Sequence, residues 1–218
     1  MDIHILGENN SLFNQFIAEI RDKKIQQDQL RFRRNLERLG EIFAYEISKT
    51  LRYKTTMVET PLGTASLSLP AGIPVLATIL RAGLPLHMGL LNYFDNAENC
   101  FILAYRKYEK DGFHIKFENI SSPNLDQKVV ILSDPMLATG ASMEIGYNAL
   151  HKRGEPAHVH MVALIASSEG VDFVKEKLGD KNTTLWIGAI DEELSSKKYI
   201  VPGLGDAGDL AFGVKFDP

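Results

Sequence analysis

The sequence predicts an α/β fold with a central, mostly parallel sheet that is flanked by helices. The first observation is that five short, nearly continuous apolar runs follow residue 74, as expected for strands buried on both faces of a parallel sheet. The second is that helical patterns alternate with these runs, so that right-handed crossovers can join neighbouring strands. The third is that glycine-containing turns follow several runs, where such sheets collect ligands.

The strands and helices of this core can be given in chain order. The apolar runs are VLATIL, CFILAY, VVILS, VHMVALIA and TLWIGAI. Helices are expected at about 84–93, 142–153 and 168–178. Pro85 suits the first turn of the first helix, and Gly154 and Gly179 end the other two.

The part of the chain before residue 74 is expected to surround this core. The first fifty residues are helical in pattern, and apolar residues from Phe32 to Ile47 mark an amphipathic helix from residue 29 to about 51. The three arginines of RFRR are interpreted as a solvated helix face with charge pairs. TTMVETP and TASLSL form a hairpin-like element around the turn at Pro61–Gly63.

We expect residues 1–218 to form a single domain. The segment at about 107–122 is polar and then alternates, which indicates a projecting β-arm rather than a core strand. The N-terminal helices within residues 1–55 and the C-terminal residues 191–218 are expected to form a small hood. The sequence shows no internal repeat, low-complexity tract or linker.

Composition narrows the class of protein. Lys and Arg number 24 against 28 Asp and Glu, for a formal charge of −4, which gives nucleic-acid binding no support. The single cysteine, Cys100, cannot form an internal disulfide and is interpreted as a small buried hydrophobe. The N-terminus lacks the pattern of a signal peptide, and no apolar stretch is long enough for a membrane span. A cytoplasmic protein without membrane or nucleic-acid partners is expected.

The richest candidate site is the string KVVILSDPMLATGASMEIG. A strand delivers Asp134 at its carboxyl end, and a turn of small residues leads into a helix. Backbone N–H groups in such a turn can converge on an anion, and the helix N-terminus favours negative charge. Thr139 and Ser142 can donate to phosphate oxygens, whereas Asp134 suits sugar hydroxyls. The combination predicts a sugar phosphate ligand.

This string resembles a known family. DPMLATGAS is similar to the phosphoribosyl-pyrophosphate (PRPP) loop of the uracil phosphoribosyltransferases, whose usual form ends in Gly-Gly-Ser. The resemblance implies a type I phosphoribosyltransferase-like fold. Ala141 stands at the usual second glycine. A position with positive φ would make the methyl group cost roughly 1–2 kcal/mol, but its place at a helix start predicts an ordinary φ.

A second candidate loop, ILRAG, follows the strand VLATIL. Small residues beside Arg81 allow main-chain atoms to approach a diphosphate while the guanidinium neutralises it. ILRAG resembles the pyrophosphate loop of the same family. Arg106, in AYRKY, matches another donor-binding arginine of the family, although the sequence after it departs from the commoner acid-rich form.

The third loop, YIVPGLGDAGD, places Asp206 and Asp209 among closely spaced glycines, which implies tight turns or close approach to a ligand. It looks like the uracil-binding segment of the family. The resemblance implies base contacts, largely through main-chain groups, at Ile200, Gly205, Asp206 and Ala207. Leu210 departs from the family pattern, which usually has a basic residue there.

The resemblance implies a pentosyltransferase of pyrimidine salvage. Uracil and PRPP would give UMP and diphosphate, with Mg²⁺ as cofactor and with Asp134, Arg81 and Arg106 as catalytic residues. Asp206 would face donor or metal. The implied substrate-binding positions are Arg81, Arg106, Asp134, Pro135, Met136, Leu137, Ala138, Thr139, Gly140, Ala141, Ser142, Ile200, Gly205, Asp206 and Ala207.

Other readings stay open at this point. Members of the family are commonly dimers or larger homo-oligomers, and GTP is an effector candidate. The alternatives are an RNA-binding pyrimidine regulator on the same fold, a transferase for another nucleobase, and a member that binds ligands without turnover. His87, His158 and His160 are interpreted as structural. The enzyme assignment requires that the three turns meet around one cavity.

Overall fold

The computed structural model describes residues 1–109 and 112–215, and between residues 105 and 116 it describes backbone only. Within these residues, eight strands form one sheet in the order β1-β10-β9-β7-β4-β5-β6, with β8 beside β9. Two further pairs form small separate sheets: β2 (Tyr53–Thr60) with β3 (Gly63–Pro70), and β11 (Glu193–Leu194) with β12 (Ile200–Val201). The strands of the main sheet are β1 (Asp2–Ile5), β4 (Val75–Leu80), β5 (Asn99–Glu109), β6 (Gly112–Ser121), β7 (Val129–Ser133), β8 (Met136–Leu137), β9 (His158–Ser167) and β10 (Thr183–Asp191).

The predicted strands of the core are confirmed. All five apolar runs lie in β4, β5, β7, β9 and β10, and the neighbours among them pair in parallel. Only the ends differ, because the polar residues that flank the apolar runs continue the backbone ladder. The antiparallel partner in this sheet is β6, which pairs with β5 and continues it as an arm.

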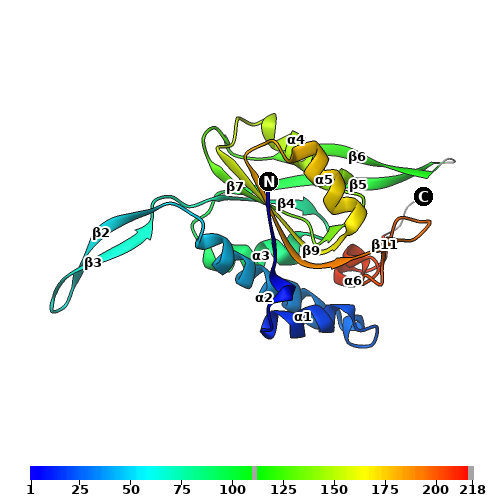
Figure 1. The fold of residues 1–218 in the computed structure, drawn as a ribbon, viewed down its shortest axis with the longest axis horizontal. Coiled ribbons are helices and arrows are strands. Elements are labelled where there is room, and N and C mark those ends of the chain that lie inside the picture. Colours follow the sequence, from blue (N-terminus) through cyan, green and yellow to red (C-terminus); the bar gives the residue numbers. More distant parts are fainter. Residues whose placement is uncertain (110–111, 216–218) are drawn as a thin grey trace.

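Helices cover both faces of the sheet (Figure 1). On one face lie α4 (Ala141–His151) and α5 (Ser168–Leu178), which contribute Leu150 and Val174 to a buried apolar cluster. On the other lie α1 (Leu12–Arg21), α2 (Gln29–Ser48) and α3 (Leu84–Tyr93), which share a second cluster with the sheet. The predicted helices are therefore confirmed, and the fold is the expected α/β architecture.

The first residues of the chain were predicted as helical, and this is wrong for β1. Asp2–Ile5 pairs in parallel with β10, so the chain starts as an edge strand of the sheet. Its residues alternate between exposed and half-buried, which is the period of a strand. Short 3₁₀ turns at Leu6–Glu8 and Ile25–Gln27 then flank α1.

The arginines of RFRR take part in charge pairs, as predicted. Arg31 donates two hydrogen bonds to Glu19, at 3.0 and 2.9 Å, and this interaction lowers the pKa of Glu19 to about 2. Arg34 pairs with Glu37 along the same helix. Arg33 differs because its guanidinium donates to the carbonyl of Ala211 at 2.7 Å. This bond joins α2 to α6 (Ala207–Phe212), so the two ends of the chain pack together as a hood.

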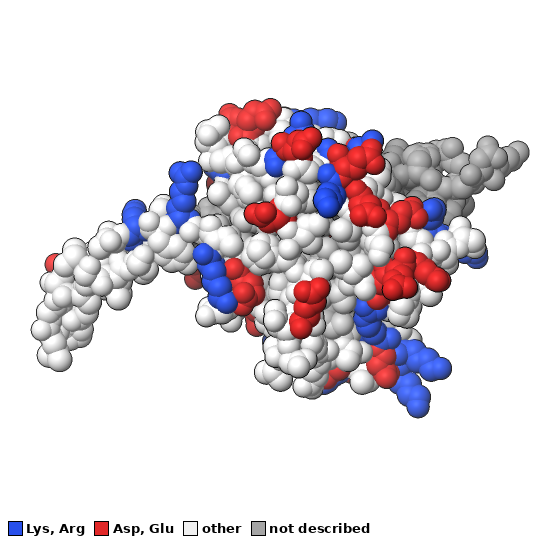
Figure 2. Space-filling model, viewed as in Figure 1, with Lys and Arg blue, Asp and Glu red and all other residues white. Residues whose placement is uncertain are grey.

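Two hairpins project from the body (Figure 1). One is the predicted arm of β5 and β6, and the other is formed by β2 (Tyr53–Thr60) and β3 (Gly63–Pro70). On the face that Figure 2 shows, Lys and Arg are interspersed with Asp and Glu rather than gathered into one basic track. Among the described residues, no helix has both the length and the apolar character that crossing a bilayer requires.

The histidines that were candidates for function have structural partners. His87 is buried, and its Nε2 lies 2.7 Å from Oδ1 of Asn99. Cys100 is also fully buried, and burial raises the pKa of its thiol, in keeping with its interpretation as a hydrophobe.

A cluster of rings spans β1, β10 and β9. The ring of His4 stacks on Trp186 at 4.2 Å, and Nε1 of Trp186 donates to Nδ1 of His160 at 3.2 Å. His158 lies 4.5 Å from His160 between ring centroids. His160 is 5% exposed, and burial, with a smaller contribution from His158 and His4, lowers its pKa from 6.5 to about 3. The folded protein therefore holds His160 neutral.

This cluster predicts acid sensitivity. Because the folded pKa of His160 lies below its unfolded value, the unfolded chain takes up the extra proton, and stability falls as pH drops from 6.5 towards 3. The contribution of His160 to the free energy of unfolding should be about 2 kcal/mol smaller at pH 5 than at pH 7. The free energy of unfolding at each pH is measured by urea unfolding, followed by the fluorescence of Trp186, the single tryptophan. His160→Gln keeps an acceptor for Trp186 and should flatten this pH dependence; an unchanged slope would contradict the assignment.

Candidate active site

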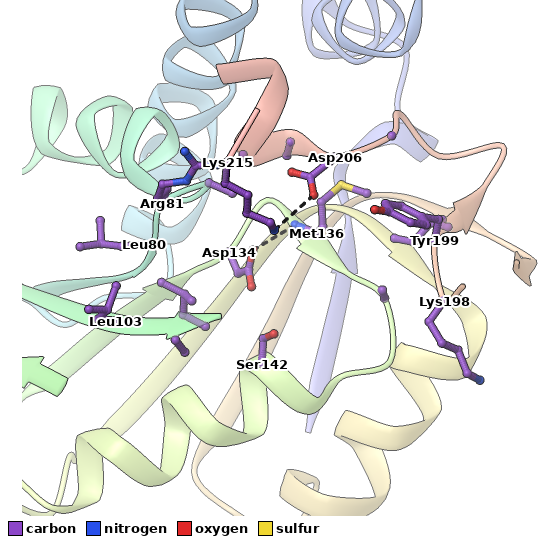
Figure 3. A pocket seen from close by; sticks show the side chains of 18 residues that line it. Leu80, Arg81, Leu103, Asp134, Met136, Ser142, Lys198, Tyr199, Asp206 and Lys215 are labelled. Carbon is purple, nitrogen blue, oxygen red and sulfur yellow. Dashed lines mark hydrogen bonds and ion pairs between the residues drawn. The ribbon is translucent and has the colours of Figure 1, made fainter. Parts of the chain in front are cut away.

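The three predicted turns meet around one cavity of about 530 Å³ (Figure 3). They come from the loop after β4, the loop after β7 and the C-terminal segment beyond β10. The predicted convergence is therefore confirmed as geometry. The cavity is lined by Ile79, Leu80, Arg81, Ala82, Leu103, Ala104, Asp134, Met136, Ala138, Ser142, Lys198, Tyr199, Ile200, Gly205, Asp206, Ala207, Gly208 and Lys215.

Asp134 lies at the carboxyl end of β7, only 8% exposed but facing the cavity. One of its carboxylate oxygens accepts from the backbone N–H of Met136 at 3.3 Å. Pro135 does not line the cavity or the smaller hollow beside it. Its carbonyl accepts hydrogen bonds from the backbone N–H groups of Leu164 and Ile165, both at 3.1 Å. The loop is thus held against β9, and the carboxylate has a defined position.

The small residues after Asp134 surround a second, smaller hollow beside the cavity, lined by Met136, Leu137, Ala138, Thr139, Gly140, Ser142 and Met143. Ser167 donates to the carbonyl of Ala138 at 2.5 Å and fixes the turn. Gly140 has φ 83° and precedes the helix α4. Ala141 is the first residue of α4 and has no positive φ, so its methyl group is accommodated as expected.

Arg81 follows β4 across a cis peptide bond from Leu80. Its guanidinium donates to Asp209 at 3.0 Å and to the carbonyl of Gly213 at 3.4 Å, so it joins the first loop to the third. The side chain remains 42% exposed at the cavity. Gly83 is required here because an added Cβ would collide with the side chain of Thr78.

The third loop runs from β12 (Ile200–Val201), which pairs with β11 (Glu193–Leu194), to α6. Gly205 has φ 95°, a conformation that favours glycine. Asp206 caps α6: one oxygen accepts from the backbone N–H of Asp209 at 3.0 Å, and the other lies 3.9 Å from the ammonium of Lys215. Ile200, Gly205, Asp206 and Ala207 all line the cavity, as the resemblance implied.

An ion pair that holds the third loop was missed by sequence reasoning. Arg21, at the end of α1, binds both oxygens of Asp191 at 2.7 and 2.8 Å. Asp191 also accepts from the backbone N–H of Gly203 at 2.8 Å, and Arg21 donates to the carbonyl of Gly203 at 3.1 Å. Asp191 is 8% exposed, so the pair is well shielded from solvent. No local pattern marks residues so far apart in sequence.

The cavity residues that were not singled out from the sequence include three with polar or charged side chains: Lys198, Tyr199 and Lys215. Lys198 pairs with Glu169, at 3.1 Å, on the rim. The departure at Leu210 has a structural account, because this side chain packs against the apolar cluster on the α1–α2 face. The side chain of Arg106 lies outside the described residues, although its backbone belongs to β5.

The cavity has oxygen ligands of the kind that would suit a magnesium ion. Asp134 and Asp206 both present carboxylates to it, and hard oxygen ligands suit Mg²⁺. Among the described residues, no cluster of three or more His, Cys, Asp or Glu side chains could hold a metal ion. Mg²⁺ is commonly bound by one or two carboxylates together with substrate phosphates, which is what this arrangement allows.

The turn before α4 predicts that substitutions at two adjacent positions change stability by different amounts. Gly140→Ala places a methyl group at φ 83°, and its Cβ would lie 2.5 Å from Cδ1 of Phe173, so stability should fall by at least roughly 1–2 kcal/mol. Ala141→Gly, the matched control, should change the free energy of unfolding by less than about 1 kcal/mol. Chemical denaturation of both variants measures this, and equal effects would contradict the assigned backbone conformations.

Comparison with known proteins agrees with this geometry. A family model described as uracil phosphoribosyltransferase matches residues 8–214. A uracil phosphoribosyltransferase of Porphyromonas gingivalis is 55% identical over 216 residues, covering 99% of this chain and 100% of that protein. One from Methanothermobacter thermautotrophicus is 39% identical and covers 94% of this chain and 93% of its own length. The solved structure of the AQ2163 protein from Aquifex aeolicus matches with a TM-score of 0.85 at 30% identity, covering 97% of this chain and 98% of that one. The chain therefore belongs to the uracil phosphoribosyltransferases, a family of pentosyltransferases.

Proposed function

We propose that this chain transfers the 5-phosphoribosyl group of PRPP to N1 of uracil, giving UMP and diphosphate. The observation that carries the proposal is the convergence of three separate turns on one cavity. The first two loops bring an anion-binding turn, a carboxylate and an arginine to this cavity, which match the phosphates and hydroxyls of a sugar donor. The third loop brings a glycine-rich segment to the same cavity, which matches a base. At about 530 Å³ the cavity falls within the size range of small-molecule sites.

The donor is bound by the first two loops in this proposal. The turn from Ala138 to Ser142 holds the 5-phosphate, because backbone N–H groups and the N-terminus of α4 favour an anion there. Asp134 accepts hydrogen bonds from the ribose hydroxyls. Arg81 neutralises the diphosphate, assisted by Arg106 from β5. To bind the diphosphate, the guanidinium of Arg81 must release its hydrogen bond to Asp209 and donate to a phosphate oxygen instead.

The base is read by the third loop. Uracil offers an N3–H donor between two carbonyl acceptors, whereas cytosine has an acceptor at N3 and an amine at C4. Backbone groups from Ile200 to Ala207 are rigid because β12, Asp191 and the α6 cap hold the segment. A rigid set of partners would leave buried polar groups unpaired against cytosine, which costs orders of magnitude in rate. Met136 and Tyr199 face this side of the cavity and offer apolar walls for a planar ring (Figure 3).

The chemical step breaks the bond between C1 of ribose and the diphosphate oxygen and forms a bond from N1 of uracil to C1. The diphosphate leaves with the bonding electron pair, and the N1 proton passes to water or to an oxygen of the departing diphosphate. Mg²⁺, bound with the donor, would neutralise the leaving group, and Asp206 and Asp134 are the carboxylates positioned towards it. The chain itself contributes positioning and charge stabilisation, which are large effects when donor and base are held in line.

We also propose that the chain acts as a homodimer through the β2–β3 hairpin. This hairpin forms a two-stranded sheet of its own, and such pairs are marginally stable in water. Large apolar side chains are nevertheless exposed on it, among them Met57 at 63%, Leu62 at 100% and Leu67 at 47%. Exposed apolar surface of this kind marks an interaction site, and a second copy with two-fold symmetry is the commonest partner.

The proposed reaction predicts a strong base preference. Initial rates with PRPP and Mg²⁺ should give a kcat/KM for uracil at least roughly a hundredfold above that for cytosine, hypoxanthine or orotate. Formation of UMP is followed directly by chromatography. Comparable rates with another base would overturn the base assignment. GTP added to the same assay tests its expected role as an effector.

Two variants of the site test the assigned roles and show that the measured activity does not come from a contaminating enzyme. Asp134→Asn removes the proposed ribose contact and Arg81→Ala the proposed diphosphate contact, and each should lose at least roughly 2 kcal/mol of transition-state stabilisation. Circular dichroism should show the same fold as the unmodified protein. Near-normal turnover in both variants would refute the assigned roles while leaving the reaction itself established.

The dimer proposal predicts that charge on the hairpin separates the subunits. In sedimentation velocity experiments, Met57→Lys combined with Leu67→Lys should lower the mass of the particle from that of a dimer to that of a monomer. The reason is that lysines buried in an interface without partners oppose association. Thr64→Lys adds a single lysine at an exposed polar position of the hairpin and should stay dimeric. A single-copy mass for the unmodified protein would exclude the proposal.

A further inference from the structure

We infer that Lys215 is a binding residue for the diphosphate group of the donor, and that its ammonium stays beside Asp206 until the donor enters. The inference rests on the proposed function, since it assigns one more contact to the same substrate. Neither the family resemblance nor the pattern of glycines and acids pointed to this residue. It follows from where the chain after α6 runs.

The segment after α6 turns back into the cavity and is fixed by its backbone. Gly213, with φ 84°, donates to the carbonyl of Asp209 at 2.8 Å. The backbone N–H of Lys215 donates to the carboxylate of Asp209 at 3.4 Å, and Arg81 bonds to both Asp209 and the carbonyl of Gly213. Lys215 is therefore anchored at its main chain beside the proposed diphosphate-binding arginine.

The side chain of Lys215 reaches towards the centre of the site. In Figure 3 it extends into the space between Asp206 and Asp134. Its ammonium lies 3.9 Å from a carboxylate oxygen of Asp206. The other cationic side chains described in the cavity lining, Arg81 and Lys198, already bond to Asp209 and to Glu169 respectively. Lys215 is thus the described cavity cation that projects into the space the donor would fill.

The ammonium is held loosely enough to change partners. A distance of 3.9 Å is beyond hydrogen-bond reach, and the side chain is 33% exposed. Lysine carries its charge on a flexible stem, so its ammonium can move to a new anion while the backbone stays in place. A diphosphate carries more negative charge than one carboxylate and attracts the ammonium more strongly. Entry of the donor would therefore transfer Lys215 from Asp206 to a phosphate oxygen.

Calorimetric titration with two probes tests this step. Inorganic diphosphate carries the group that Lys215 is proposed to bind, whereas UMP carries the sugar phosphate and base without it. Lys215→Met, which keeps length and removes charge, should weaken binding of diphosphate, and raise the KM for PRPP, by roughly tenfold. The affinity for UMP should stay within roughly twofold. Lys215→Arg should restore most of the diphosphate affinity.

The control is Lys197→Met, which removes the same charge from an exposed position outside the cavity lining and should bind both probes normally. Unchanged or tighter binding of diphosphate by Lys215→Met would overturn the inference, and tighter binding would mean that the ammonium blocks the empty site. Equal weakening for UMP would also overturn it. Absence of UMP synthesis by the unmodified protein would instead refute the proposed function.

Discussion

Arg21 and Asp191 form a shielded ion pair that joins the end of α1, the end of β10 and the third loop at one point. Asp191 ends a central strand, Arg21 ends a helix of the hood, and both bond to Gly203 at the start of the glycine-rich segment. Removing one partner of a shielded ion pair leaves the other charge uncompensated, which is far more costly than losing an exposed pair. The side of the cavity that this segment forms therefore depends on this contact, together with the buried side chains of Ile200 and Leu204.

The donor side is held differently. Its turns follow directly from strands in the middle of the sheet, where hydrogen bonds such as that from Ser133 to Ala77 join neighbouring strands at their carboxyl ends. Parallel strands bring these ends to one edge without further help. The site thus joins two kinds of support: the edge of the sheet beneath the proposed sugar-phosphate position, and a surface segment, fixed by an ion pair, beneath the proposed base position. Arg81 bridges them through Asp209.

The parts that were predictable from the sequence are those encoded locally. Continuous apolar runs identified the strands, and Gly154 and Gly179 fall just beyond the two helices that they were expected to end. Ala141 was expected to take an ordinary φ because a helix starts there, and it does. The edge strand Asp2–Ile5 was missed because four residues are too few to show a period against the helical pattern that follows.

What could not be predicted depends on contacts across the chain. Arg21 and Asp191 are 170 residues apart, and either could have been a solvated surface charge. Lys215 is a single lysine after a flexible glycine, and nothing in its neighbours indicates that it turns inwards. Sequence reasoning found the residues that carry recognisable patterns, and the tertiary structure was needed for those whose role is set by the partner they meet.

The loops that form the cavity lie far apart in the sequence, and this affects the order in which they are available during synthesis. The strands next to the proposed phosphate-binding turn are complete once β9 has left the ribosome, but Gly205, Asp206 and the helix that packs on Arg33 are synthesised later. Domains generally begin to fold from the N-terminus during translation. A nascent chain would thus form the proposed phosphate-binding turn well before the segment proposed to distinguish one nucleobase from another.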